Sequence, residues 1–265
     1  MKNMLLLVHD DDGQEARLQT ALDLTRALHG HLTCVDVTVL PMMMADFAGG
    51  ADQALLVVEE REREAKHKTV IADRLERENV SWDWIDVTGD MVSAMLDQSM
   101  LADLIILNRK LGETDYPDMY GVTSRVVTEA RVPVVAVPQN QKGFGTERAL
   151  IAWDGGAACA AAMRASVPLL QLASQVCIFS AVERREEFAL EAPAAYLSRH
   201  GIHATTRVVE RGKAAADEMI SAECRDWGAD YVVMGAYGRG RLREVFGGVT
   251  KRMLGMSSIP LVLAH

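Results

Sequence analysis

The chain lacks several features that would assign it to common functional classes. Aromatic residues make up only 5% of its 265 residues, and its formal net charge is −9. The negative charge argues against a sequence-independent grip on nucleic-acid phosphates. No apolar run approaches the length of a membrane span, and the apolar start Met4–Val8 is too short for a signal peptide. We therefore expect a cytoplasmic protein that binds neither nucleic acid nor membrane.

Cysteine is also scarce, and its spacing does not suggest a redox or zinc motif. The four cysteines are Cys34, Cys159, Cys177 and Cys224, and they form no C-x-x-C pair. The histidines are scattered rather than grouped at zinc-ligand spacing. We interpret all four cysteines as reduced, structural residues and assign no metal ligand. Walker A, Ser-His-Asp and Cys-His patterns do not stand out, so no catalytic residue is assigned.

The chain does contain an internal repeat of one unit. The apolar run that ends in Asp10 matches the run that ends in Asp154, an offset of 144 residues. Two further strand-like patterns, one introduced by Ala-Asp and one by a proline, repeat at an offset of 127 residues. Self-similarity at half the chain length predicts a duplication. We expect a first copy over residues 1–138, a linker over 139–147 and a second copy over 148–265.

Within each copy, short apolar runs alternate with longer patterns of helical spacing. This alternation predicts an α/β fold whose parallel sheet of five strands is covered by helices on both faces. Pro168 interrupts the first helical pattern of the second copy and is expected to kink or end it. Extra length in the first copy, from about Pro41 to Lys68, contains Met42–Met44 and a charged helix. We interpret it as a loop with a solvated helix, or else as a flap over a site or partner.

The most informative segment runs from Val232 to Leu254 and combines glycines with basic residues. An apolar run ends at Gly235, and a second glycine pair at 247–248 comes just before a helical pattern. Glycines let backbone N–H groups approach a ligand closely, and a helix N-terminus favours negative charge. The segment therefore predicts a phosphate-binding loop at the carboxyl end of a parallel strand.

Together with the run around Asp154 and the closing strand PLVLAH, this segment resembles the universal stress protein family in its tandem, two-domain UspA-type form. Nucleotide-binding members of that family carry Gly-x2-Gly-x9-Gly-(Ser/Thr). Gly235 and Gly238 match the first pair of glycines. The resemblance implies two Rossmann-like domains, an adenine nucleotide (ATP, ADP or AMP, with or without magnesium) and a role as a stress-response sensor or regulator.

The end of the motif departs from the family pattern in either of two registers. If Gly248 is the third glycine, Val249 stands where the hydroxyl residue belongs. If Gly247 is the third glycine, Gly248 replaces the hydroxyl residue and the loop is one residue short. In both registers Thr250 is the nearest hydroxyl side chain.

The resemblance implies a nucleotide site in the second copy. Asp154 would accept hydrogen bonds from ribose hydroxyls, although an aspartate here can also cap the following helix. Ala181 and Val182 would offer backbone groups to adenine, and Arg239 would add positive charge near the phosphates. The expected site residues are Ala152, Trp153, Asp154, Ala181, Val182, Met234, Gly235, Gly238, Arg239, Gly240, Gly247, Gly248, Val249 and Thr250.

The first copy lacks most of these signals. Asn108 stands at the position of the first glycine. In place of the second glycine segment, the first copy has only Gly121. Three successive aspartates, 10–12, would repel a polyphosphate in the absence of a metal. We expect no tight nucleotide binding there. Its role would be to pair with the second copy, with Val132–Val137 beside Ile259–Ala264, because an apolar edge strand needs a cover.

Two alternatives to a nucleotide-binding regulator remain open. One is a nucleotide-free interaction module in which both sites have decayed, addressing an unidentified protein partner. The other is an enzyme on a related fold, such as an electron-transfer flavoprotein subunit or an adenylating enzyme, for which no flavin or second substrate site is evident. For the favoured reading we expect slow hydrolysis or none. Association of two whole chains into a homodimer is left open.

Overall fold

A computed structural model describes residues 1–39, 50–112, 117–183, 190–236 and 243–265 of the chain. In the second helix, side chains are described from residue 63 onward, and in the last helix from residue 248 onward. The expected Met42–Met44 insertion and the site residues Gly238, Arg239 and Gly240 lie outside the described residues.

The first copy alternates strands and helices as the repeat predicts. Its elements in chain order are β1 (Asn3–Val8), α1 (Gln14–Ala27), β2 (His31–Thr38), α2 (Gly50–Arg77), β3 (Ser81–Thr88), α3 (Met91–Gln98), the short 3₁₀ helix η2 (Ser99–Leu101), β4 (Leu104–Lys110), α4 (Met119–Glu129) and β5 (Val134–Pro138).

The second copy follows the same order without a long insertion after its second strand. Its elements are β6 (Arg148–Ala152), α5 (Ala157–Ala165), α6 (Val167–Leu170), β7 (Gln175–Val182), α7 (Glu191–Arg199), β8 (Ala204–Glu210), α8 (Ala216–Trp227), β9 (Tyr231–Gly235), α9 (Arg243–Met256) and β10 (Leu261–Ala264). The break between α5 and α6 falls at Ser166, and Pro168 lies in the first turn of α6, where its missing N–H costs nothing. The expected interruption is confirmed.

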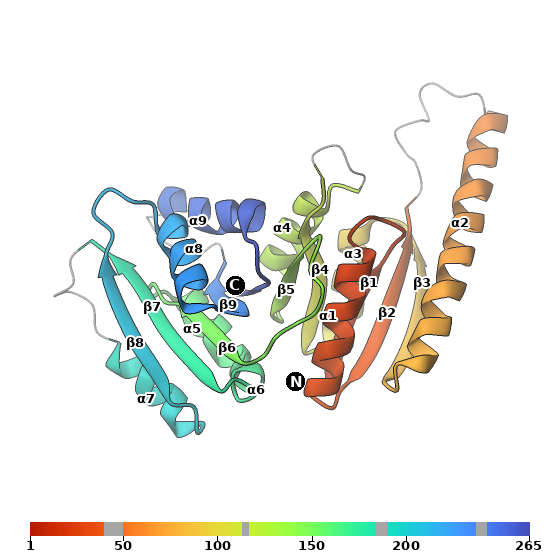
Figure 1. Ribbon diagram of the computed structural model, residues 1–265. Coiled ribbons are helices and arrows are strands. Elements are labelled where there is room, and N and C mark those ends of the chain that lie inside the picture. The colour runs from red at the N-terminus through yellow and green to blue at the C-terminus, as the bar shows by residue number, and fades with distance from the viewer. Residues whose placement is uncertain (40–49, 113–116, 184–189, 237–242) are drawn as a thin grey trace.

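All ten strands form one sheet in the order β3-β2-β1-β4-β5-β10-β9-β6-β7-β8 (Figure 1). Within each copy every strand pair is parallel, which confirms the predicted α/β architecture. Two packed layers cover the sheet. The core on one face contains residues of α1, α2, α5, α6 and α7, and the core on the other face contains residues of α3, α4, α8 and α9.

The two copies meet where their last strands pair. Strand β10 runs antiparallel to β5, with Leu261 opposite Ala136, Val262 opposite Val135, and Leu263 opposite Val134. This is the expected pairing of the two fifth strands. It covers the edge that each five-stranded sheet would otherwise expose, so the chain contains an internal pseudo-dimer.

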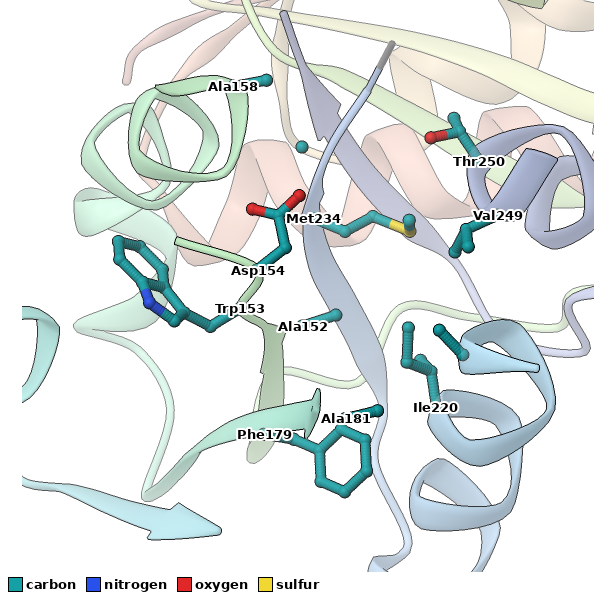
Figure 2. A pocket seen from close by; sticks show the side chains of 12 residues that line it. Ala152, Trp153, Asp154, Ala158, Phe179, Ala181, Ile220, Met234, Val249 and Thr250 are labelled. Carbon is teal, nitrogen blue, oxygen red and sulfur yellow. The ribbon is translucent and has the colours of Figure 1, made fainter. Parts of the chain in front are cut away.

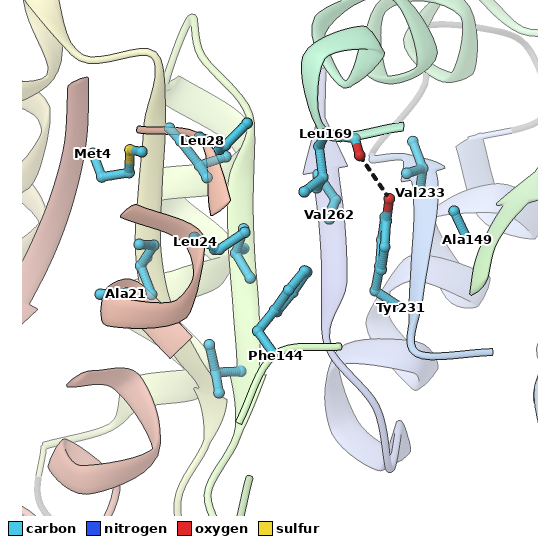
Figure 3. Close-up of a cluster of buried hydrophobic side chains, with 14 of the residues drawn as sticks. Met4, Ala21, Leu24, Leu28, Phe144, Ala149, Leu169, Tyr231, Val233 and Val262 are labelled. Carbon is cyan, nitrogen blue, oxygen red and sulfur yellow. Dashed lines mark hydrogen bonds between the residues drawn. The ribbon is translucent and has the colours of Figure 1, made fainter. Parts of the chain in front are cut away.

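The segment that joins the copies adds a second connection between them. Phe144 is 6% exposed and packs between α1 and the second copy (Figure 3). Its ring centroid lies 5.2 Å from that of Tyr231, and its backbone N–H donates to Asp23 Oδ2 at 2.9 Å. Because the linker contributes to the shared core, it does more than tether two independent units.

The charged helix of the first copy differs from the solvated helix expected from the sequence. Helix α2 has 28 residues and lies along the outer edge of the sheet beside β3 (Figure 1). Glu64, Ile71 and Leu75 on this helix are buried. The buried residues are spaced at helical periodicity among charged ones, so α2 packs one face against the sheet. Among the described residues, no helix is long and apolar enough to cross a membrane.

Candidate functional site

A pocket lies in the second copy beyond the carboxyl ends of β6, β7 and β9, where α8 and α9 close it from the side (Figure 2). It encloses about 570 Å³ of empty space, part of it open to solvent. Its lining residues are Ala152, Trp153, Asp154, Ala158, Phe179, Ala181, Ala216, Ile220, Met234, Gly235, Val249 and Thr250. In an open α/β sheet, the crevice at the carboxyl ends of the strands is the usual place for a ligand.

Eight of these twelve residues belong to the set expected from the sequence. Val182 is buried at the end of β7 but does not line the pocket. Gly247 lies in α9, and Gly248 adjoins the lining residue Val249 without lining the pocket itself.

The other four lining residues were missed by sequence reasoning. Ala158 comes from the first turn of α5, and Phe179 from β7, two residues before Ala181. Ala216 and Ile220 lie one turn apart on α8. The alternation of strand residues could have pointed to Phe179, because positions two apart share a face. Nothing in the sequence indicated that α8 closes the pocket.

The pocket has an apolar end and a polar end. Phe179, Ile220 and Met234 are buried and surround the apolar end, while Asp154 and the hydroxyl of Thr250 belong to the polar end. An apolar slot with a few convergent polar groups is the usual composition of a small-molecule site.

Asp154 is exposed, and its carboxylate is held in place by the turn that follows it. Its Oδ1 accepts a hydrogen bond from the backbone N–H of Gly156 at 2.7 Å. Gly155 has a φ of 76°, a left-handed conformation that favours glycine. The N-cap residue of α5 is Gly156, so the reading of Asp154 as the N-cap is wrong by two residues. Its second carboxylate oxygen has no hydrogen bond within the described structure.

Trp153 contributes to the pocket wall differently from its neighbours. Figure 2 shows its indole ring directed away from Met234 and Val249. The backbone of Trp153 is fixed instead: its N–H donates to the carbonyl of Phe179 at 2.8 Å, and its carbonyl accepts from Ser180 Oγ at 2.8 Å. We infer that Trp153 sets the position of Asp154 rather than stacking on a ligand.

Gly235 has a packing role that the sequence did not reveal. A Cβ at this position would collide with the backbone N of Cys159 and would lie 2.7 Å from the carbonyl carbon of Ala158. The first turn of α5 therefore packs directly on the end of β9, and only a residue without a side chain leaves room for it. This contact explains Gly235 without any ligand.

The expected start of the last helix is corrected by the structure. The sequence placed the helix N-terminus at the second glycine pair, but α9 begins at Arg243. Only the first four N–H groups of a helix lack an internal partner. The backbone N–H groups of Gly248, Val249 and Thr250 therefore lie inside the helix and are engaged by its own carbonyls, so they do not form a phosphate-binding N-terminus.

The structure also corrects the alignment of the two copies. Asp103 and Asp230 are equivalent at the offset of 127, and their backbone N–H groups donate to the carbonyls of Asn3 and Arg148 respectively. The first strands are therefore offset by 145 residues, not 144, which makes His9 the counterpart of Asp154. From the start of the first strand to the start of the first helix, copy one then has two more residues than copy two (Asn3 to Gln14 against Arg148 to Ala157).

In copy one, a buried arginine fills the space at the ends of the strands. The Arg17 side chain is fully buried, and its Nη1 and Nη2 donate to the two carboxylate oxygens of Asp11 at 2.8 and 2.9 Å. The other acceptors around the guanidinium are the carbonyls of Leu7 and His9 and the side-chain oxygens of Gln14 and Asn108. All five N–H donors of the guanidinium thus have partners.

Where the first helix meets the fourth strand, each copy has one glycine, but on opposite sides of the contact. In copy one the glycine is Gly13, at the N-terminus of α1, where a Cβ would collide with Asn108 Oδ1. In copy two the glycine is Gly235, on the strand, and the backbone of α5 at Ala158 and Cys159 packs against it. Arg17 is the fourth residue of α1, and the fourth residue of α5 is Ala160. The second copy therefore has no long polar side chain where copy one has Arg17.

His9 is covered by α2 rather than exposed to solvent as Asp154 is. Its Nδ1 lies 3.0 Å from Glu64 Oε1, and His67 Nδ1 lies 3.8 Å from Glu64 Oε2. Burial raises the pKa of Glu64, but its interactions with His67 and His9 outweigh this and lower the pKa to about 2. Burial, together with the charge of Glu64, raises the pKa of nearby Asp36 to about 7.

The four cysteines are free and buried, as expected. Burial raises the pKa of Cys34, Cys159 and Cys224 to about 12, and it raises the pKa of Cys177 as well. A reactive cysteine needs a lowered pKa, so these thiols are poor nucleophiles at neutral pH. Among the described residues, no group of three or more His, Cys, Asp or Glu side chains is arranged to hold a metal ion.

Comparison with known proteins places the chain among proteins of this fold. Residues 157–265 match the model of the universal stress protein family. A universal stress protein from Archaeoglobus fulgidus DSM 4304 is 17% identical, with 99% of this chain and 95% of that chain covered at a TM-score of 0.76. A protein of unknown function from Pseudomonas aeruginosa PAO1 is 15% identical, with 99% and 92% covered at a TM-score of 0.64.

A universal stress protein crystallised in complex with cAMP also matches, at 13% identity, with 52% of this chain and 98% of that chain covered. Its TM-score of 0.34 is too low for an argument about the site. No curated protein matches the chain by sequence. The second copy therefore carries a universal stress protein domain, and the chain as a whole has the tandem two-domain fold of that family.

Proposed function

We propose that the second copy binds one adenine nucleotide in the pocket at the ends of β6, β7 and β9, that the first copy binds none, and that the protein acts as a nucleotide-dependent regulator. The observation that supports this most directly is the contrast between the copies. Eight expected site residues line a pocket in copy two, whereas in copy one the counterpart of Asp154 is the buried His9, and Asn108 stands in place of Gly235 and binds the buried Arg17.

The two ends of the pocket suggest how a nucleotide would lie. The adenine ring would enter the apolar end between Phe179, Ile220 and Met234, with the backbone beside Ala181 as a source of hydrogen bonds. Asp154 would accept hydrogen bonds from the ribose hydroxyls, because its exposed carboxylate has acceptor capacity beyond the contact to Gly156. The phosphates would extend past Thr250.

Magnesium would be bound mainly by the phosphates. Mg²⁺ usually keeps several waters and takes one or two carboxylates in addition to substrate phosphates. Asp154 is the carboxylate that lines the pocket, so the described residues fit a nucleotide-borne Mg²⁺ and not a dedicated metal cage. Among the described residues, none of those that line the pocket is a histidine or a lysine. We therefore expect binding with slow hydrolysis or none.

A second candidate is a nucleotide-free interaction module. Two observations favour it: Gly235 is explained by packing against α5, and the N–H groups of Gly248–Thr250 lie inside α9. In this case the conserved architecture would serve only to present surfaces to an unidentified protein. Four free thiols fit a reducing compartment such as the cytoplasm under either function.

Isothermal titration of the nucleotide-stripped protein with ATP and Mg²⁺ separates the two functions. We expect one nucleotide per chain. Asp154→Asn should weaken binding by about tenfold, because a charge-assisted hydrogen bond contributes roughly 1.5–3 kcal/mol. Asp10→Asn is the matched control, since Asp10 is a half-exposed aspartate in the equivalent loop of copy one and pairs with Arg63 at 3.4 Å.

Each outcome has a definite meaning. Two nucleotides per chain would contradict the proposal that copy one binds none. Absence of heat and of any thermal shift with ATP, ADP, AMP or adenosine would rule out the proposed site and leave the interaction module as the function.

A further inference from the structure

One wall of the pocket belongs to a helix of low intrinsic stability. Helix α9 contains three glycines, at positions 247, 248 and 255, among its 14 residues. Glycine is, after proline, the residue least favourable to a helix interior, because fixing its backbone costs the most entropy. Val249 and Thr250 of this helix line the pocket (Figure 2). The position of that wall therefore depends on what holds α9 in place.

Part of the surface that holds α9 belongs to copy one. Val249, Met253 and Leu254 are buried in a core that also contains Val126 and Val127 of α4. This core is continuous across the two copies, on the face of the sheet that α4 and α9 cover. The apolar side of α9 thus packs in a core that both halves of the chain build.

Copy one also reaches the backbone at the end of α9. Arg109, in the last part of β4, donates from Nη1 to the carbonyls of Leu254 and Gly255 at 2.9 and 2.8 Å. The Tyr120 hydroxyl on α4 donates to the carbonyl of Lys251 at 3.3 Å. The last four carbonyls of a helix lack a partner within it. Arg109 therefore satisfies two groups that α9 cannot satisfy by itself.

The charge of Arg109 suits the same place. A cation is favourable at a helix C-terminus, and the last turn of α9 has no basic residue of its own. Leu254, which Arg109 binds, is also connected to the pocket wall. In the i→i−4 pattern of a helix its N–H pairs with the carbonyl of Thr250. A contact made by copy one is thus one hydrogen bond away from a residue that lines the pocket of copy two.

We propose that copy one positions the pocket wall of copy two: Arg109 and Tyr120 hold the last turns of α9 and so keep Val249 and Thr250 in place for a ligand. This inference rests on the proposed nucleotide site. Copy one would then contribute to the affinity of a ligand that it does not touch. Because such coupling is reciprocal, a bound nucleotide would in turn strengthen the contact between the copies.

Titration of the full-length, nucleotide-stripped protein with ATP and Mg²⁺ tests the proposal. The variants are Arg109→Gln, Tyr120→Phe and the double variant, each titrated well below its melting temperature. We expect the double variant to bind ATP about fivefold more weakly than the wild type and each single variant to lose less. The apparent affinity falls with the fraction of molecules whose α9 is in place. Arg109→Lys should retain part of the affinity, because it keeps a cation at the helix end.

The matched control removes the same kind of contact far from the pocket. Lys2 Nζ donates to the carbonyls of Leu28 and His29, at 2.7 and 3.1 Å, just beyond the C-terminal end of α1. Lys2→Gln should lower the melting temperature and leave the ATP affinity unchanged. A loss of ATP affinity in Lys2→Gln equal to that in Arg109→Gln would contradict a specific role for the α9 contact.

A rescue variant separates the position of α9 from the charge of Arg109. A Cβ at Gly255 meets nothing within 4 Å, and alanine favours a helix more than glycine does. Arg109→Gln/Gly255→Ala should therefore recover part of the ATP affinity that Arg109→Gln loses, although the charge is still absent.

Two further outcomes would overturn the inference in distinguishable ways. If the wild type binds ATP and the double variant binds it equally well, the contacts of Arg109 and Tyr120 only stabilise the fold, and the nucleotide site itself stands. If the wild type binds no nucleotide, the proposed function fails and the positioning role fails with it.

Discussion

The two copies share one scaffold, but their first helices meet the ends of the strands in different ways. At the end of the first strand, copy one has His9, 1% exposed beneath Glu64 of α2, whereas copy two has Asp154, exposed at the pocket. Beside them, copy one inserts the fully buried Arg17, and copy two has Ala160 on the equivalent turn of its helix. In copy two the backbone of the first turn of α5 packs on Gly235 instead, at the position where Asn108 meets Arg17 in copy one.

This difference shows how the two copies of a duplicated fold can take different roles. Arg17 satisfies the polar ends of β1 and β4 from within, so copy one needs no ligand to complete its hydrogen bonds. Copy two has a pocket beyond the ends of β6, β7 and β9. A copy that is complete by itself can serve as a rigid support, while the incomplete copy is free to respond to a ligand. The antiparallel β5–β10 pair links the two in one sheet.

The largest effect is expected when the buried arginine of copy one is replaced. Arg17→Met should lower the free energy of unfolding by about 3–5 kcal/mol, because it leaves the buried Asp11 carboxylate without its partner. Urea denaturation measures the change. The control is Arg26→Met on the same helix, whose ion pairs with Asp23 and Glu78 are partly exposed and should contribute less than about 1 kcal/mol. Equal losses in the two variants would contradict the role given to Arg17.

The titratable cluster around His9 should give copy one a pH dependence that copy two lacks. The raised pKa of Asp36 means that the folded state holds its proton more tightly than the unfolded chain does. Stability contributed by this group therefore falls as the pH rises from about 4 to about 7. The lowered pKa of Glu64 has the opposite effect: its contribution is present above about pH 4.5 and is lost as the pH falls toward 2.

Thermal unfolding between pH 4 and 8 measures this effect. Asp36→Asn should flatten the decline in stability above pH 4, whereas Asp97→Asn, at an exposed position on α3, should leave the slope unchanged. A wild-type slope that persists in Asp36→Asn would show that another group is responsible.

A smaller loss is expected from a methyl group at the strand end of copy two. Gly235→Ala should destabilise the protein by about 1–3 kcal/mol, because the added Cβ forces the first turn of α5 away from β9. Gly255→Ala is the matched control, since a Cβ there meets nothing within 4 Å. Scanning calorimetry in the absence of nucleotide measures the change in stability. An unchanged stability of Gly235→Ala would show that packing against α5 does not require a glycine here, and would leave ligand binding as its role.

The smallest effect concerns the support that copy one gives to α9. Arg109 Nη1 donates to the carbonyls of Leu254 and Gly255 at 2.9 and 2.8 Å, at the C-terminal end of a helix with no basic residue of its own in the last turn. Arg109→Gln should cost about 1 kcal/mol, the usual size of a charge at a helix C-terminus. Hydrogen exchange should show the increase in opening in the last turn of α9, and uniform exchange across the helix would argue against this contact.

Much of the architecture could be predicted from the chain alone. Apolar runs such as Leu104–Leu107 alternate with helical patterns, and this alternation correctly indicated parallel strands covered on both faces. The pairing of the fifth strands followed from the need to cover an apolar edge. These features depend on local periodicity and on chain connectivity, both of which are evident from the sequence.

The site was predicted less completely. Asp154, Ala181 and Thr250 were located, because strand ends and motif spacing mark them. Arg17 was not, since a fully buried arginine looks like any polar residue of an amphipathic helix until its partners from three other segments are known. The one-residue error in aligning the first strands had the same origin: only the hydrogen bonds of Asn3 and Arg148 show the true register.

The sequence by itself determined the duplication, the α/β class and the approximate place of the site, because hydrophobic periodicity and glycine positions act over a few residues at a time. Only the tertiary structure decided that Arg17 is buried, that Gly235 packs against α5 and that α8 and α9 close the pocket. Those properties depend on contacts between segments such as α5 with β9 and α8 with α9. Their distances are set by the packing of the whole sheet, which no local pattern records.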